Sequence, residues 1–111
     1  MPTQQEIDAI FPAMVENFSP DKAQGTNAVI QFDLTGENSG QYWVKIDNGT
    51  CNAGQGEPPE APKMTISASS SDFYSLVTGK LNVMQAFMSG KIKVKGDMGL
   101  AMKMAGMFGL G

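Results

Sequence analysis

The sequence predicts a single α+β domain, and three observations lead to this prediction. Segments in which every second residue is apolar, typical of β-strands, fill the middle of the chain. Segments whose apolar residues recur three or four positions apart, typical of helices, lie toward both ends. The 111 residues, of which 41% are hydrophobic and 17% charged, suffice for one hydrophobic core, so we expect one domain over residues 1–111.

The first helix is expected over residues 3–18. Thr3 and Glu6 have the spacing of a capping box, in which the side chain of each residue bonds to the backbone amide of the other. Apolar residues then recur at helical spacing up to Phe18. Pro12 has no amide hydrogen, so it is expected to kink this helix or to mark a restart.

Four segments then read as strands of a meander. Residues 26–36 and 39–49 alternate apolar and polar side chains, as half-buried strands do. Asn48-Gly49 is typical of a type I′ hairpin turn and predicts a third strand from residue 50 to 53. A loop rich in proline and glycine follows, and residues 63–68 resume the alternation as a fourth strand.

Two short helices and a last strand come next. Ser71 or Asp72 is expected to cap a helix that ends at Gly79, and Asn82 to cap a helix that ends at Gly90. The sequence KIKVK, residues 91–95, alternates strictly and predicts a strand with its lysines on the side away from the core. These lysines either solvate a sheet face, protect an edge from mispairing, or attract an anionic surface.

The final helix, capped by Asp97, has an unusually wide apolar surface. At 100° per residue, its apolar side chains cover an arc of roughly 220°, whereas packing on one sheet needs little more than about 100°. Six of the nine methionines of the chain lie between residues 84 and 107, and methionine is common on adaptable apolar surfaces. The excess face is expected to meet neighbouring helices, a membrane, another subunit or a bound apolar molecule.

Charge and composition exclude several classes of function. The chain has one cysteine, no histidine and no arginine, which removes cysteine–histidine metal cages and the Ser-His-Asp and Cys-His catalytic arrangements. We therefore expect that the protein is not an enzyme and that it has no catalytic residues, no metal and no cofactor. The net charge is −3, which disfavours nucleic acid. Residues 79–111, however, hold five lysines against one aspartate, a balance that suits an anionic head group or membrane surface.

The segment SDFYSLVTGKLNVMQAFMSGKIKVKGDMGLAMKM, residues 71–104, resembles the signature of the sterol carrier protein type 2 (SCP-2-like) lipid-transfer domain family. The segment VIQFDLTGENSGQYWVKIDNG, residues 29–49, is similar to the first hairpin of that family. The likeness spans about residues 5–108, although Val83 stands where many members carry proline. It implies a mainly antiparallel five-stranded sheet, with helices largely on one face enclosing an apolar tunnel that holds lipids.

The resemblance implies a non-catalytic function, namely the binding and transfer of fatty acid, fatty acyl-CoA or sterol-like lipids. The alternative is an interaction or accessory domain that uses its apolar C-terminal face. We expect Lys80 and Lys103 to contact a lipid head group or a membrane. The sequence has neither a secretory signal nor a peroxisomal tripeptide, so a cytoplasmic location is expected. The side chains expected to bind lipid are Leu76, Leu81, Met84, Phe87, Met88, Met98, Met102, Met104, Ala105 and Phe108.

Overall fold

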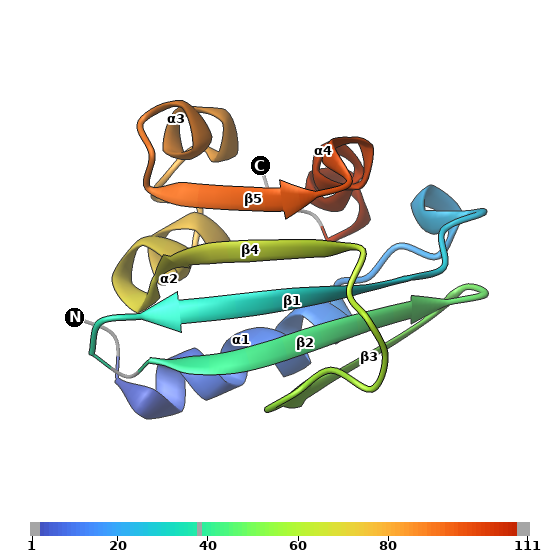
Figure 1. The fold of residues 1–111 in the computed structure, drawn as a ribbon, viewed down its shortest axis with the longest axis horizontal. Helices are drawn as coiled ribbons and strands as arrows, with labels where there is room; N and C mark the ends of the chain where they lie inside the picture. The colour runs from blue at the N-terminus through green and yellow to red at the C-terminus, as the bar shows by residue number, and fades with distance from the viewer. Residues whose placement is uncertain (1–2, 38, 109–111) are drawn as a thin grey trace.

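A five-stranded sheet forms the centre of the molecule (Figure 1). The structure is a computed structural model that describes residues 3–37 and 39–108. Its elements are, in chain order, α1 (Gln4–Glu16), the short 3-10 helix η1 (Asp21–Ala23), β1 (Ala28–Thr35), β2 (Gly40–Asp47), β3 (Thr50–Gln55), β4 (Met64–Ser69), α2 (Ser70–Val77), α3 (Val83–Met88), β5 (Ile92–Gly96) and α4 (Met98–Met107).

The strand order is β3-β2-β1-β4-β5, and the sheet is mixed. Three pairings are antiparallel, β1 with β2, β2 with β3 and β4 with β5, whereas β1 and β4 run parallel. The mainly antiparallel five-stranded sheet is therefore confirmed, with one parallel pair added. The parallel pair arises because residues 56–63 carry the chain from β3 across the sheet to β4. Glu60 in this loop bonds to the ammonium group of Lys45 at 3.0 Å.

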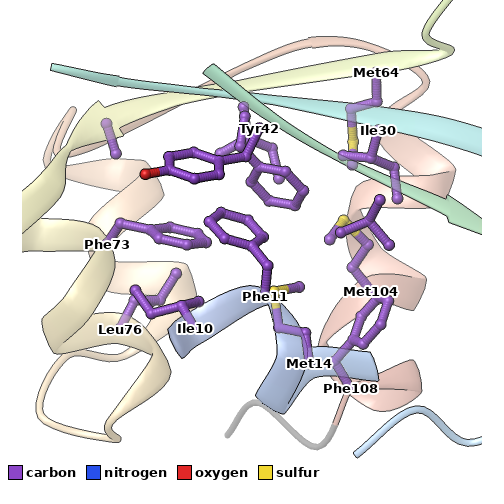
Figure 2. Packing of buried hydrophobic residues seen from close by; sticks show 14 of the residues in the cluster. Ile10, Phe11, Met14, Ile30, Tyr42, Met64, Phe73, Leu76, Met104 and Phe108 are labelled. Carbon is purple, nitrogen blue, oxygen red and sulfur yellow. The ribbon is translucent and has the colours of Figure 1, made fainter. Parts of the chain in front are cut away.

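The hydrophobic core lies between one face of the sheet and helices α1, α2 and α4. Phe11 of α1 points toward the sheet between Phe73 of α2 and Tyr42 of β2 (Figure 2). The ring of Phe11 stacks on that of Tyr42 with centroids 4.4 Å apart and meets Phe32 of β1 edge to face at 5.4 Å. These rings fill much of the space between α1 and the sheet. The helices cover one face, as expected.

Local signals in the sequence explain most of the helix and turn positions. The capping box of Thr3 and Glu6 is present, and the side chains of Asn82 and Asp97 cap α3 and α4. Asn48 and Gly49 both have positive φ angles, 50° and 82°, as a type I′ turn requires.

Two expectations about the helices need correction. Helix α2 begins earlier than expected, because Ser69 rather than Ser71 or Asp72 provides the cap and accepts a bond from the amide of Asp72. Helix α1 runs without a break from Gln4 to Glu16 with Pro12 inside it, so of the two expected effects of Pro12, a kink or a restart, the restart is absent.

Candidate functional site

An apolar cavity lies between α1 and α2, whereas the sequence predicted a lipid site among residues 76–108. Its volume is about 270 Å³. Its buried side is formed by Ile10, Met14 and Phe108, and it is a groove between the two helices. The ten residues that line it are Glu6, Ala9, Ile10, Ala13, Met14, Asn17, Tyr74, Val77, Thr78 and Phe108.

Helix α1 provides one long wall because its lining residues recur every three or four positions and so share one side of the helix. Ile10 and Met14 are buried and form the floor, whereas Ala9 and Ala13 lie at the rim. The small side chains of these two alanines leave open the volume that larger residues would occupy. The cavity therefore depends on alanine at two positions of an otherwise ordinary amphipathic helix.

A hydrogen bond joins the two helices at one end of the cavity. The hydroxyl of Tyr74 donates to Oε2 of Glu6 at 2.6 Å. This bond, together with the backbone amide of Thr3, lowers the pKa of the Glu6 carboxyl, and the same bond raises the pKa of the Tyr74 hydroxyl. Glu6 is thus held as a carboxylate that faces the groove, and it is the one charged side chain among the described lining residues.

The C-terminal end of α4 closes another side of the cavity. The ring of Phe108 lies 5.6 Å from that of Phe18, centroid to centroid. The amide of Ser19 donates to the carbonyl of Met107 at 2.7 Å. These contacts fix Phe108 against the end of α1, where it is buried and lines the groove (Figure 2).

The structure divides the residues that the sequence predicted to bind lipid into three groups. Phe108 lines the cavity. Leu76 and Met104 lie in the packed core, and Leu81 is half-buried against it. Met84, Phe87, Met88, Met98 and Met102 are exposed on α3 and α4, and Lys80 and Lys103 are exposed as well. The side chain of Ala105 lies outside the part of the chain that the structure describes.

Sequence reasoning missed most of the cavity wall, including Ala9, Ala13, Asn17 and Thr78. The apolar periodicity of this segment predicts an amphipathic helix, and alanines at the border of its apolar side do not indicate whether that border is packed or open. Knowledge of where α2 lies relative to α1 was needed to find the groove. A signal was nevertheless present, because Ala9 and Ala13 are four positions apart beside Ile10 and Met14.

The remaining polar features do not form a second site of the same kind. A cavity of about 300 Å³ lies where residues 56–63 cross the sheet, and its walls include Lys45, Asp47, Glu60 and Lys63. Partial burial raises the pKa of the Cys51 thiol on β3 to about 11, so a smaller fraction of this thiol is thiolate at neutral pH than for an ordinary cysteine. Within residues 3–37 and 39–108, acidic and cysteine side chains form no cluster that could hold a metal ion. No helix in these ranges is long and apolar enough to cross a bilayer.

Comparisons with known proteins agree on the fold. A model of the SCP-2 sterol transfer family matches residues 8–109. The chain is 41% identical over 104 residues to hydroxysteroid dehydrogenase-like protein 2 of Danio rerio, covering 94% of this chain and 25% of that protein. The chain thus spans between 19% and 25% of the length of such curated relatives.

Two solved structures are similar over nearly the whole chain. The sterol carrier protein domain 2 of Helicoverpa armigera superimposes with a TM-score of 0.71 at 30% identity, covering 92% of this chain and 81% of that one. Palmitated SCP2L2 from Aedes aegypti superimposes with a TM-score of 0.73 at 24% identity, covering 94% of this chain and 92% of that one.

Proposed function

The chain belongs to the SCP-2 sterol transfer family, and on this premise we propose that it binds the apolar part of a lipid between α1 and α2 and transfers it reversibly. The single observation that carries this proposal is the apolar groove lined by Ala9, Ile10, Ala13, Met14 and Phe108. The ligand is a fatty acid, a fatty acyl-CoA or a sterol-like lipid. The palmitated state of the Aedes aegypti protein supports an acyl chain.

The size of the cavity implies that it widens when a lipid binds. Its volume of about 270 Å³ is just below the range of roughly 300–1,000 Å³ that is common for ligand pockets. A long chain therefore enters by separating α1 from α2 and by turning the flexible side chain of Met14. Each methylene removed from water contributes about 0.8 kcal/mol, so a chain of roughly 15 carbons has enough apolar surface to drive this change.

The polar group of the lipid lies at an open end of the groove. Lys80 is exposed and lies two residues after Thr78, which lines the cavity. Its ammonium group can therefore attract a carboxylate or phosphate at this end of the groove. Lys103 lies on the exposed side of α4 and is assigned to membrane contact. Glu6 and Tyr74 at the groove instead suit a ligand hydroxyl, which can donate to the carboxylate.

We propose binding without catalysis, in the cytoplasm. The one hydroxyl bonded to a carboxylate in the groove is that of Tyr74, and its bond to Glu6 raises the pKa of the Tyr74 hydroxyl, which keeps this group protonated at neutral pH. The Cys51 thiol lies outside the groove. Incubation with a fatty acyl-CoA should leave the thioester intact. Release of free coenzyme A, catalysed in proportion to protein concentration, would contradict this part of the proposal.

The experiment that tests the function directly combines two measurements. Mass spectrometry of the protein under native conditions identifies any lipid that co-purifies and its stoichiometry. The delipidated protein is then titrated with a fluorescent fatty acid and with a fluorescent sterol. Saturable binding at one lipid per chain supports the proposal, whereas no binding of either ligand, with the fold intact, would overturn it.

A second candidate function is an accessory domain that docks to another protein through its apolar C-terminal face. The exposed side chains of α3 and α4 favour it, as does the greater length of the curated relatives. Lipid binding and this docking role separate experimentally, because only the first predicts saturable titration of the isolated chain with lipid.

A further inference from the structure

The polar side chains that line the groove between α1 and α2 offer a ligand mainly hydrogen-bond acceptors. These side chains are Glu6, Asn17, Tyr74 and Thr78. The polar end of a lipid that lies in the groove must bond to the atoms that these four residues leave unpaired. Which atoms remain follows from their hydrogen bonds within the protein.

The carboxylate of Glu6 keeps acceptor capacity after its own bonds are counted. Its Oε1 accepts from the backbone amide of Thr3 at 3.0 Å, and its Oε2 accepts from the hydroxyl of Tyr74 at 2.6 Å. An ionised carboxylate can accept about four hydrogen bonds, so about two acceptor positions stay open. Because Glu6 is exposed at the rim of the groove, a ligand can reach these positions.

The hydroxyl of Tyr74 also presents acceptors alone. A phenol has one proton, and Tyr74 donates it to Glu6, so only the lone pairs of its oxygen remain for a ligand. This bond preserves the arrangement at neutral pH, because it lowers the pKa of the Glu6 carboxyl and raises the pKa of the Tyr74 hydroxyl.

Thr78 and Asn17 already use most of their donor protons within the helices. The hydroxyl of Thr78 donates to the carbonyl of Tyr74 at 2.8 Å and lies 3.3 Å from that of Ser75. The side-chain amide of Asn17 donates to the carbonyl of Ala13 at 3.0 Å, which leaves it one N–H. Among the described side chains of the lining, that N–H is the one donor without a partner in the protein.

The charge of the groove favours the same kind of ligand. Glu6 is anionic, and no lysine is among the described residues of the lining. Lys80 lies two residues beyond Thr78 and outside the lining, so it acts on a head group that stays outside the groove. A carboxylate or phosphate in the groove would meet a like charge and few donors, whereas a hydroxyl or an ammonium group can donate to Glu6.

We propose that the Glu6–Tyr74 pair makes the groove select lipids whose polar end donates hydrogen bonds, a hydroxyl or a primary ammonium, over lipids whose polar end is an anion. This inference rests on the proposed function and narrows its ligand class. Glu6 determines the specificity, since it supplies the charge and the open acceptor positions, and Tyr74 positions it. Fatty acids still bind through their chains, but more weakly than donor lipids of the same length.

Three lipids that share one chain and differ in their polar end test the inference: lauryl alcohol, laurylamine and laurate. Each is used to displace a fluorescent fatty acid from the delipidated full chain at neutral pH. We expect laurate to bind at least about tenfold more weakly than either of the others, because hydrogen bonds to a charged group are stronger than those between neutral groups. Laurylamine and laurate each carry one charge, so their comparison removes the general preference of an apolar groove for uncharged lipids.

Variants assign the selectivity to one carboxylate. Glu6→Gln keeps the length of the side chain, removes the charge and adds an amide donor, so laurate should bind within about threefold of laurylamine. Glu16→Gln is the matched control, because it removes the same charge from the same helix at a residue outside the lining. Tyr74→Phe retains the carboxylate. Both Glu16→Gln and Tyr74→Phe should keep the wild-type ranking of the three lipids.

Three outcomes would overturn the inference. The first is wild-type protein that binds laurate as tightly as laurylamine. The second is an equal change of the ranking in Glu16→Gln and Glu6→Gln, which would assign the effect to the net charge of the helix. The third is a ranking lost in Tyr74→Phe but kept in Glu6→Gln. The relative affinities of the alcohol and the amine distinguish the two donor groups, and either order supports the inference provided that laurate is the weakest.

The same titrations separate this inference from the proposed function. If none of the three lipids displaces the probe in a saturable manner, the proposed function fails. If all three displace it equally in the wild type and in Glu6→Gln, the function stands and the selectivity is refuted. Circular dichroism verifies that each variant is folded; if Glu6→Gln unfolds, the comparison of laurylamine with laurate in the wild type and in Tyr74→Phe decides the question.

Discussion

Filling the groove between α1 and α2 should abolish lipid binding without unfolding the protein. The change is the double substitution Ala9→Leu/Ala13→Leu. Both alanines line the cavity yet are exposed at its rim, so leucine at these positions meets no packed core. Leucine and alanine both favour helices, so the effect on α1 itself is small.

The magnitude follows from the volume that the new side chains occupy. Two leucines place about six additional carbon atoms in a cavity of about 270 Å³, and these displace a similar number of lipid methylenes. At about 0.8 kcal/mol for each methylene, the loss approaches 5 kcal/mol, and the affinity falls at least a hundredfold. The assay is titration of delipidated protein with a fluorescent fatty acid, with thermal unfolding followed by circular dichroism.

The control is Gln5→Leu, which adds an exposed leucine to the same helix outside the cavity. It should bind lipid like the wild type. If the double variant stays folded and binds within threefold of the wild type, the lipid lies elsewhere and the reasoning is refuted.

Three other predictions concern individual residues. Tyr74→Phe should raise the pKa of the Glu6 carboxyl toward its ordinary value of 4.5, which carbon-13 NMR of that carboxyl measures against pH. Because the folded-state pKa of Glu6 is lowered, its bond to Tyr74 stabilises the fold above about pH 4.5, and this stabilisation is lost as the pH falls through the folded pKa. A Glu6 pKa that is the same in the variant and the wild type would exclude the bond. The Cys51 thiol, with its pKa raised from 9.0 to about 11, should be alkylated about a hundredfold more slowly at pH 7 than an exposed thiol, and labelling at the rate of an exposed thiol would contradict its burial. Gly54→Ala should destabilise the protein by about 1–3 kcal/mol in urea unfolding, because the added Cβ would lie 2.5 Å from the ring of Trp43. A variant as stable as the wild type would show that the ring does not pack against residue 54.

Signals confined to a few residues in the sequence predicted the local structure well. The capping residues Thr3, Asn82 and Asp97 and the turn at Asn48-Gly49 act through contacts with residues at most three positions away, so their effect is readable from the sequence. The alternation of apolar residues predicted the five strands, and the family resemblance supplied their arrangement in one sheet and the expectation of lipid binding.

Features that depend on long-range packing could not be predicted. The parallel pairing of β1 with β4 follows from the path of residues 56–63. The amino-acid composition of this loop does not indicate which strand β4 pairs with or in which direction. Apolar periodicity on α4 could not distinguish Met104, which is buried, from Met102, which is exposed, because both belong to one wide arc. The cavity likewise depends on the placement of α2 beside α1.

Methyl NMR of the methionines tests most directly whether a lipid binds between α1 and α2. Met14 lines the cavity, whereas Met84, Met88 and Met102 are exposed on the opposite sides of α3 and α4 from the core. Carbon-13 labelled methionine methyl groups give one signal for each residue, and the protein is titrated with a monomeric fatty acid in the absence of vesicles. We predict that the Met14 signal shifts in a saturable manner and shows nuclear Overhauser effects to the acyl chain, while the signals of Met84, Met88 and Met102 stay in place. Saturable shifts and acyl-chain contacts at Met84 and Met102, with the Met14 signal unchanged, would contradict the assignment of the groove as the lipid site.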